Sequence, residues 1–216
     1  MHIGIAIPTP QVVSTQFALE NLPMIMSEAR KAGHKISLIH KGGVMTSSNR
    51  NYMLEKYLET DVDAILWLDC DQIYPNDIVK TLVNANVDII GSVYYKRQPP
   101  YEPVVYLKSG KSVNPYTPVD LREYPKVHLE VDGIGFGGML VKMDVYRKMG
   151  DDKWMRYGKN FGNPSKTTGK ESHDLIFCQM AQKYGYKIYV HNGVRCLHIA
   201  EYPVGEEDYG RMRDNA

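Results

Sequence analysis

Two aspartates separated by one residue carry the clearest chemical signal in the sequence. Asp69 and Asp71 directly follow the uncharged run Ala-Ile-Leu-Trp-Leu at 64–68, and Pro75 follows shortly after. Such a run is typical of a central, buried strand of a parallel sheet. Because alternate residues of an extended strand share a face, we expect both carboxylates to point the same way. Paired acids at a strand's carboxyl end are typical ligands of Mg²⁺ or Mn²⁺ shared with phosphate oxygens, although they could also cap a helix beginning at Pro75.

Three other residues are candidates on weaker grounds. Arg50 precedes a helical pattern and could make a forked contact with the base or phosphate of a nucleotide, or be an ordinary solvated arginine. Asp132 could bond to sugar hydroxyls, although an Asp-Gly turn needs no function to explain it. Gly133 follows it and would let the backbone approach a sugar closely.

The glycines at 133, 135 and 138 also match the G-x-G-x-x-G spacing of dinucleotide-binding proteins. That motif requires a helix directly after it, in the first βαβ unit. Here residues 139–143 continue as a strand pattern, and the motif lies past the middle of the chain. We therefore exclude a nicotinamide or flavin site.

The order of the elements predicts how these residues are positioned. Strand patterns alternate with helical patterns through the first half, which predicts an α/β fold with a doubly wound, mostly parallel sheet and helices on both faces. The segment 97–125 is rich in proline and reads as a loop, and 151–169 could form a lid over phosphates or a solvated loop. The expected strands are 2–8, 35–40, 64–68, 87–95, 104–107, 127–131, 138–143, 187–190 and 194–197, and the expected helices are 18–29, 48–59, 75–86, 143–149 and 171–184.

Composition sets the broad class of the protein. The 216 residues, 43% hydrophobic and 24% charged, predict one domain over 1–216, with a nucleotide-binding half at 1–96 and an acceptor-side half at 97–216. The net charge of +1 gives no overall attraction to nucleic acid or anionic membrane. Three widely spaced cysteines argue against a disulfide framework and a structural zinc. With no leader and no run of 18 apolar residues, we expect no membrane span and a cytoplasmic location.

The sequence resembles the GT-A fold glycosyltransferases, especially the small family 2-like enzymes of bacteria and their phages. The order of several short segments along most of the chain carries this resemblance. These segments are Pro-Thr at 8–9, SNRN at 48–51, LWLDCDQIYP at 66–75, DIIG at 88–91, YYKR at 94–97, VDGIG at 131–135, HDLIFC at 173–178, YGYKI at 184–188 and CLH at 196–198.

The resemblance implies a donor and metal site. By this resemblance Asp71 is a metal ligand, Asp69 reaches the metal or the sugar, and His198 completes the metal shell. An imidazole ligand favours Mn²⁺ over Mg²⁺. Pro8 and Thr9, at the end of the first strand, would line the nucleobase pocket.

The resemblance also implies a catalytic base. Asp174 matches the acidic residue at the start of the helix after the acceptor loop, where the family usually has Glu-Asp and this chain has His173-Asp174. In an inverting transfer this carboxylate would remove the proton from the acceptor hydroxyl. The structural alternative is an aspartate favoured at a helix N-terminus by the macrodipole.

The implied activity is transfer of a sugar from a nucleoside-diphosphate donor, a UDP- or GDP-sugar, to an acceptor hydroxyl. A non-catalytic nucleotide-sugar or carbohydrate-binding module is one alternative, favoured by the departure at His173. A sugar nucleotidyltransferase is less favoured, because Pro-Thr-Pro-Gln at 8–11 replaces the glycine-rich phosphate loop. The sequence does not identify the acceptor, and a DNA base as acceptor would require local basic clusters. If a phage encodes the chain, the expected location is the host cytoplasm.

Overall fold

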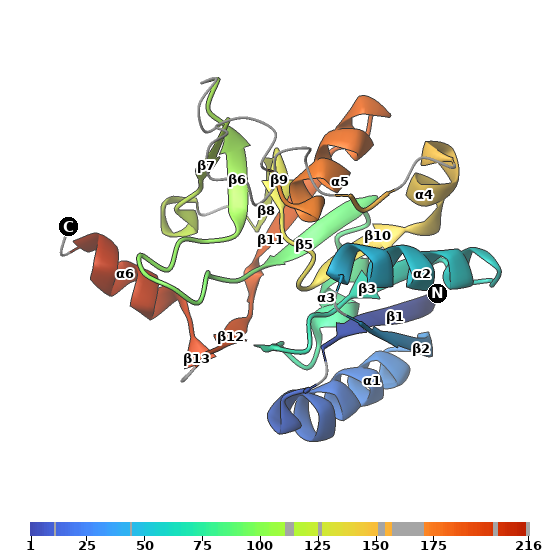
Figure 1. The fold of residues 1–216 in the computed structure, drawn as a ribbon. Coiled ribbons are helices and arrows are strands. Elements are labelled where there is room, and N and C mark those ends of the chain that lie inside the picture. Colours follow the sequence, from blue (N-terminus) through green and yellow to red (C-terminus); the bar gives the residue numbers. More distant parts are fainter. Residues whose placement is uncertain are drawn as a thin grey trace.

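The structure is a computed structural model that describes residues 1–10, 12–43, 45–110, 115–124, 127–150, 154–156, 171–200 and 203–214. Most of the segment predicted as a lid lies outside these ranges. Figure 1 shows a twisted central sheet between helices, with smaller β-structure beside it. None of the helices in these ranges reaches the length and apolarity that a bilayer span requires.

A seven-stranded sheet forms the centre of the fold (Figure 1). Its pairs β2–β1, β1–β3 and β5–β11 are parallel, whereas β10 and β8 run antiparallel to their neighbours. Five strands therefore run in one direction, as the sequence predicted. In spatial order the strands are β2 (Lys35–Gly42), β1 (His2–Thr9), β3 (Ala64–Trp67), β10 (Met139–Lys142), β5 (Ile89–Val93), β11 (Ile188–Arg195) and β8 (His128–Val131).

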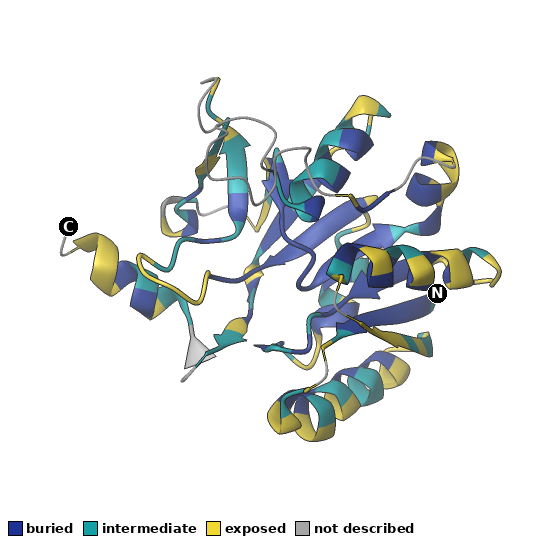
Figure 2. Cartoon of the chain, in the orientation of Figure 1, coloured by how far each residue is buried: buried dark blue, intermediate teal, exposed yellow. Residues whose placement is uncertain are grey.

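Helices cover both faces of this sheet, and the inner strands β1, β3, β10 and β5 are buried between them (Figure 2). Neighbouring residues of β3 show the division, because Leu66 packs in one hydrophobic cluster and Trp67 in the other. The α/β class with helices on both faces is therefore confirmed. The Leu66 side carries the π-helix η1 (Gln16–Asn21), α1 (Leu22–Lys31) and α3 (Ile78–Asn84), and the Trp67 side carries α2 (Thr46–Leu58), α4 (Met143–Met149) and α5 (His173–Lys183).

Two small three-stranded sheets were not predicted. One pairs β4 (Gln72–Ile73) with β12 (Leu197–Ile199), which in turn pairs with β13 (Pro203–Val204). Because His198 lies opposite Gln72 in this pairing, the sheet brings His198 close to the aspartate pair. The other sheet forms within and beside the predicted loop 97–125, and it consists of β7 (Tyr116–Pro118), β6 (Val105–Lys108) and β9 (Gly133–Ile134).

The end of the chain also differs from the prediction. The two strands expected at 187–190 and 194–197 are one strand, β11, with a register shift between Val190 and Arg195. The charged residues near the C-terminus form a helix, α6 (Glu206–Asp214). Within the predicted loop 97–125, a short 3₁₀ helix, η2, spans Leu121–Glu123. The division of the chain into two functional halves stays a prediction.

Candidate functional site

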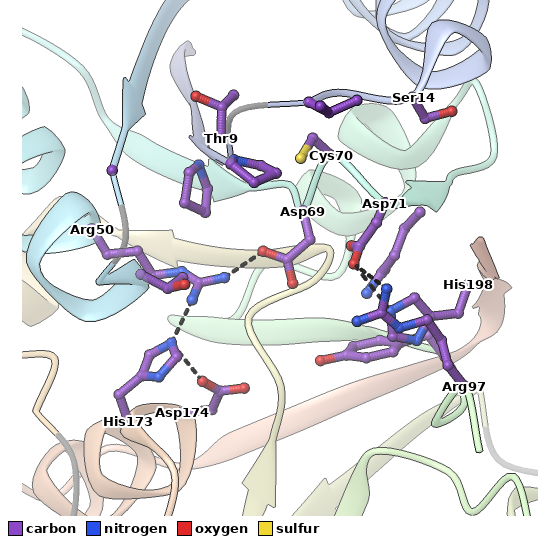
Figure 3. Close-up of a pocket in the computed structure, with 17 residues that line it drawn as sticks. Thr9, Ser14, Arg50, Asp69, Cys70, Asp71, Arg97, His173, Asp174 and His198 are labelled. Carbon is purple, nitrogen blue, oxygen red and sulfur yellow. Dashed lines mark hydrogen bonds and ion pairs between the residues drawn. The ribbon is translucent and has the colours of Figure 1, made fainter. Parts of the chain in front are cut away.

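A cleft of about 590 Å³ opens where β1, β3 and β5 end (Figure 3). Ligands of open α/β sheets bind at the carboxyl ends of parallel strands, so the position is the one expected for a binding site. Most of the predicted site residues line this cleft. They are Pro8, Thr9, Arg50, Asp69, Asp71, Asp174 and His198.

The turn that carries the two aspartates is held by a buried tyrosine. The Asp69 amide donates to the Tyr74 hydroxyl at 2.7 Å, and that hydroxyl lies 3.1 Å from the Asp69 carbonyl. The side chain of Asn21 in turn bonds the amide and the carbonyl of Tyr74, each at 2.8 Å. Because β3 ends at Trp67 and Cys70 and Asp71 form a turn, the alternation of an extended strand does not apply here. The turn nevertheless leaves both side chains lining one cleft, where each has its own partners.

Asp69 faces a chain of charged side chains from α2 and α5 (Figure 3). Arg50 donates to the Asp69 carboxylate through one nitrogen and contacts His173 through another. His173 Nε2 lies 2.8 Å from Asp174 Oδ1. Phe136 covers this chain, since its ring stacks on His173 and lies 4.7 Å from the Arg50 guanidinium. The guanidinium predicted to meet the nucleotide thus lines the cleft but is 2% exposed and already bound to internal partners.

The two carboxyl groups of this chain have pKa values shifted in opposite directions. Burial raises the pKa of Asp69, Arg50 opposes that shift, and the charges of Asp71 and Asp174 add to it. Burial also acts to raise the pKa of Asp174, but the charge and hydrogen bond of His173, together with Arg50, lower it overall. Asp174 is therefore a carboxylate at neutral pH.

Asp71 faces a different pair of side chains. Its Oδ2 atom lies 3.3 Å from Nη1 of Arg97 and 3.5 Å from Nε2 of His198 (Figure 3). Burial acts to raise the pKa of Asp71, but His198 and Arg97 lower it overall. His198 Nδ1 lies 2.7 Å from the Tyr95 carbonyl, which can only accept a hydrogen bond. Nδ1 thus carries a proton, so in the neutral ring the lone pair of Nε2 is available to a cation that binds beside Asp71.

This pair fits a cation that is shared with a ligand. Within the described ranges, no group of three or more His, Cys, Asp or Glu side chains is arranged to hold a metal ion. Mg²⁺ and similar ions, however, are commonly held by one or two protein ligands together with substrate phosphates. Asp71 and the oriented Nε2 of His198 supply such a pair, whereas the Asp69 oxygen that was also expected to reach the metal is bonded to Arg50.

Asp132 and Gly133 are not brought to this cleft. Asp132 Oδ2 accepts from the Lys108 amide at 2.7 Å, which ties β6 to the start of β9. A side chain at Gly133 would place its Cβ 2.5 Å from Leu175 Cδ2, so the glycine allows α5 to pack closely. The structure thus gives both residues a packing role at this position.

Three further residues of the cleft were not among the predicted site residues. Gln72 is fully buried, and neither atom of its amide has a hydrogen-bond partner. Tyr94 and Arg97 follow β5 and also line the cleft. The signal that could have found Arg97 is its place shortly after the buried strand β5, since Asp69 likewise follows β3 closely.

Comparisons with known proteins show the fold. No protein-family model and no curated protein matches the chain. Among solved structures, A197 from STIV is similar with a TM-score of 0.57 and 16% identity, over 96% of this chain and 92% of A197. S. aureus TarS 1-349 in complex with UDP-GlcNAc has a TM-score of 0.48 and 13% identity, over 89% of this chain and 56% of that chain. A UDP-glucose pyrophosphorylase complexed with UDP-glucose has a TM-score of 0.48 and 10% identity, over 100% of this chain and 98% of that one.

At 16% identity, the similarity to A197 shows a shared fold and nothing about activity. Together with the seven-stranded, mostly parallel sheet, it agrees with the predicted α/β fold class of GT-A type. The activity must therefore be argued from the side chains of the cleft.

Proposed function

We propose that this chain is a metal-dependent, family 2-like glycosyltransferase that moves a sugar from a UDP- or GDP-sugar to an acceptor hydroxyl. One observation carries the proposal. The Asp71–His198 pair and the Asp174 carboxylate line the same cleft, at the carboxyl ends of the parallel strands. A cation-binding pair and a carboxylate base are the two groups that such a transfer requires.

The donor end of the cleft is formed by β1 and the turn after β3. Pro8 and Thr9 lie where β1 ends, in position to line the nucleobase pocket. Asp71 and His198 would hold Mn²⁺ or Mg²⁺, which when bound supplies positive charge to the departing diphosphate. Asp69 is held by Tyr74 and Arg50 and would contact the ribose or the sugar of the donor.

Asp174 is the proposed base. In the proposed single displacement, the acceptor oxygen forms a bond with the anomeric carbon while the bond from that carbon to the diphosphate oxygen breaks. The electron pair of the broken bond leaves with the diphosphate, and the acceptor proton moves to Asp174. A single displacement of this kind inverts the anomeric centre. His173 and Arg50 keep Asp174 deprotonated at neutral pH, so it can accept that proton.

We expect UDP- or GDP-sugars to raise the melting temperature only when both Mn²⁺ and Asp71 are present. At a ligand concentration about 100-fold above Kd, binding adds about 2.7 kcal/mol, or roughly 5–10 °C for a chain of this length. A thermal-shift panel of UDP-, GDP-, CMP- and dTDP-sugars, with and without Mn²⁺, measures this for the wild type and for Asp71→Asn. Asp132→Asn is the matched control, since it removes a carboxylate outside the cleft and should keep the shift. Equal shifts in Asp71→Asn and the wild type, or none with any nucleotide, would contradict the donor site.

A further inference from the structure

The Arg97 guanidinium contacts the carboxylate oxygen on which Asp71 would hold a cation. The same carboxylate oxygen of Asp71 contacts Arg97 Nη1 at 3.3 Å and His198 Nε2 at 3.5 Å. A metal ion on this oxygen and on His198 would therefore sit beside the guanidinium, with the two positive charges a few ångströms apart. The repulsion between them disfavours having both at Asp71.

The hairpin holds the backbone of Arg97, whereas about half of its side chain is exposed. Arg97 belongs to a hairpin whose base is closed by the Tyr95–Pro103 bridge and by a hydrogen bond of 2.9 Å from the Lys96 amide to the Glu102 carbonyl. The Arg97 side chain is 52% exposed, and it forms an ion pair with Asp71. An ion pair exposed to this extent is weak, so a ligand can replace it at small cost.

We propose that Arg97 is an internal counter-ion of Asp71 that gives up this carboxylate to the divalent cation and then binds the donor diphosphate. This inference rests on the proposed function, because it takes the ligand to be a nucleoside diphosphate with its metal. Arg97 lines the cleft beside Asp71, so a short rotation of its side chain reaches a diphosphate held there. A guanidinium can make a forked contact with two oxygens of a phosphate group. Its present contact with Asp71 is a single one at 3.3 Å.

This role gives Arg97 opposite effects on two ligands. Without nucleotide, Arg97 competes with the cation, so its removal should tighten metal binding. With nucleotide, Arg97 becomes a phosphate ligand, so its removal should weaken diphosphate binding. Because any nearby positive charge acts in the same two directions through space, the test needs a neighbouring cation as its control.

Lys96 provides that control. It precedes Arg97 on the same hairpin, is paired with Glu102 at 2.5 Å, and does not line the cleft. Mn²⁺ titrations without nucleotide, followed by electron paramagnetic resonance of the free ion, compare the wild type, Arg97→Gln and Lys96→Gln. Calorimetric titrations with UDP and GDP at saturating Mn²⁺ then compare the same proteins, with Arg97→Lys to separate the charge from the forked geometry.

For Arg97→Gln we expect Mn²⁺ binding about three- to tenfold tighter and diphosphate binding about tenfold weaker. Lys96→Gln should change each affinity by less than about twofold, and Arg97→Lys should fall between the wild type and Arg97→Gln. Equal Mn²⁺ affinities in the wild type and Arg97→Gln would overturn the inference, and so would matching effects in Arg97→Gln and Lys96→Gln. In either case, wild-type binding of UDP or GDP would leave the proposed function intact. A wild type that binds Mn²⁺ but no nucleotide would overturn both.

Discussion

Replacing Asp174 with asparagine is expected to lower the rate of donor cleavage about 10³-fold while changing donor affinity by less than about threefold. Asparagine keeps the size of the side chain and its place at the start of α5, but it cannot accept the proton. The asparagine amide can still contact His173 Nε2, so the fold should persist. Water can serve as the acceptor, and release of nucleoside diphosphate from the donor found by thermal shift gives the rate.

The controls for Asp174→Asn separate chemistry from structure. Asp132→Asn removes a carboxylate that is bonded to the Lys108 amide outside the cleft, and it should leave the rate within about twofold. The pKa of Asp174 lies below its ordinary value, so Asp174 stays deprotonated between about pH 5 and pH 8. Protonation of Asp174 should therefore cause no loss of the wild-type rate over this range. A rate of Asp174→Asn close to that of the wild type would remove Asp174 from the mechanism.

Replacing Arg50 with methionine is expected to lower the free energy of unfolding by about 3 kcal/mol or more. Arg50 is buried, and its guanidinium neutralises the Asp69 carboxylate while lying over the Phe136 ring. Methionine fills much of the same space but leaves Asp69 without a positive partner, close to two other carboxylates. Urea denaturation at constant pH measures the loss, and a loss below about 1 kcal/mol would contradict a structural role for the pair.

The double variant Arg50→Met with Asp69→Asn should be more stable than Arg50→Met alone, because the unpaired charge is then absent. The pH dependence has a definite sign. Burial already raises the pKa of Asp69, and loss of Arg50 removes the largest of the causes that oppose this rise. The folded single variant therefore keeps a proton that the unfolded chain releases above about pH 4, so its stability should fall as pH rises above about 4. In the double variant that dependence should disappear.

The sequence predicted the parts of the site that lie next to strong local signals. The uncharged run before Asp69 is a buried strand, and the helix expected at 171–184 places Asp174 in the cleft. The order of strands and helices was sufficient for the α/β class. These features depend on periodicity within one segment, which a single sequence contains.

Long-range pairing accounts for what the sequence did not predict. β4 has two residues and forms because β12 pairs with it, so no local pattern marks it. Two strands were expected at 187–190 and 194–197, but a register shift keeps β11 continuous. The position of Arg97 beside Asp71 likewise depends on how a hairpin folds back over the cleft, which sequence spacing does not describe.

Release of nucleoside diphosphate from UDP- and GDP-sugars, measured with and without Mn²⁺, tests the central claim most directly. The account predicts release by the wild type that requires Mn²⁺ and is lost in Asp71→Asn. Binding of a donor that depends on Mn²⁺ and Asp71 but yields no diphosphate would contradict it, and would assign the chain to the non-catalytic nucleotide-sugar-binding class instead.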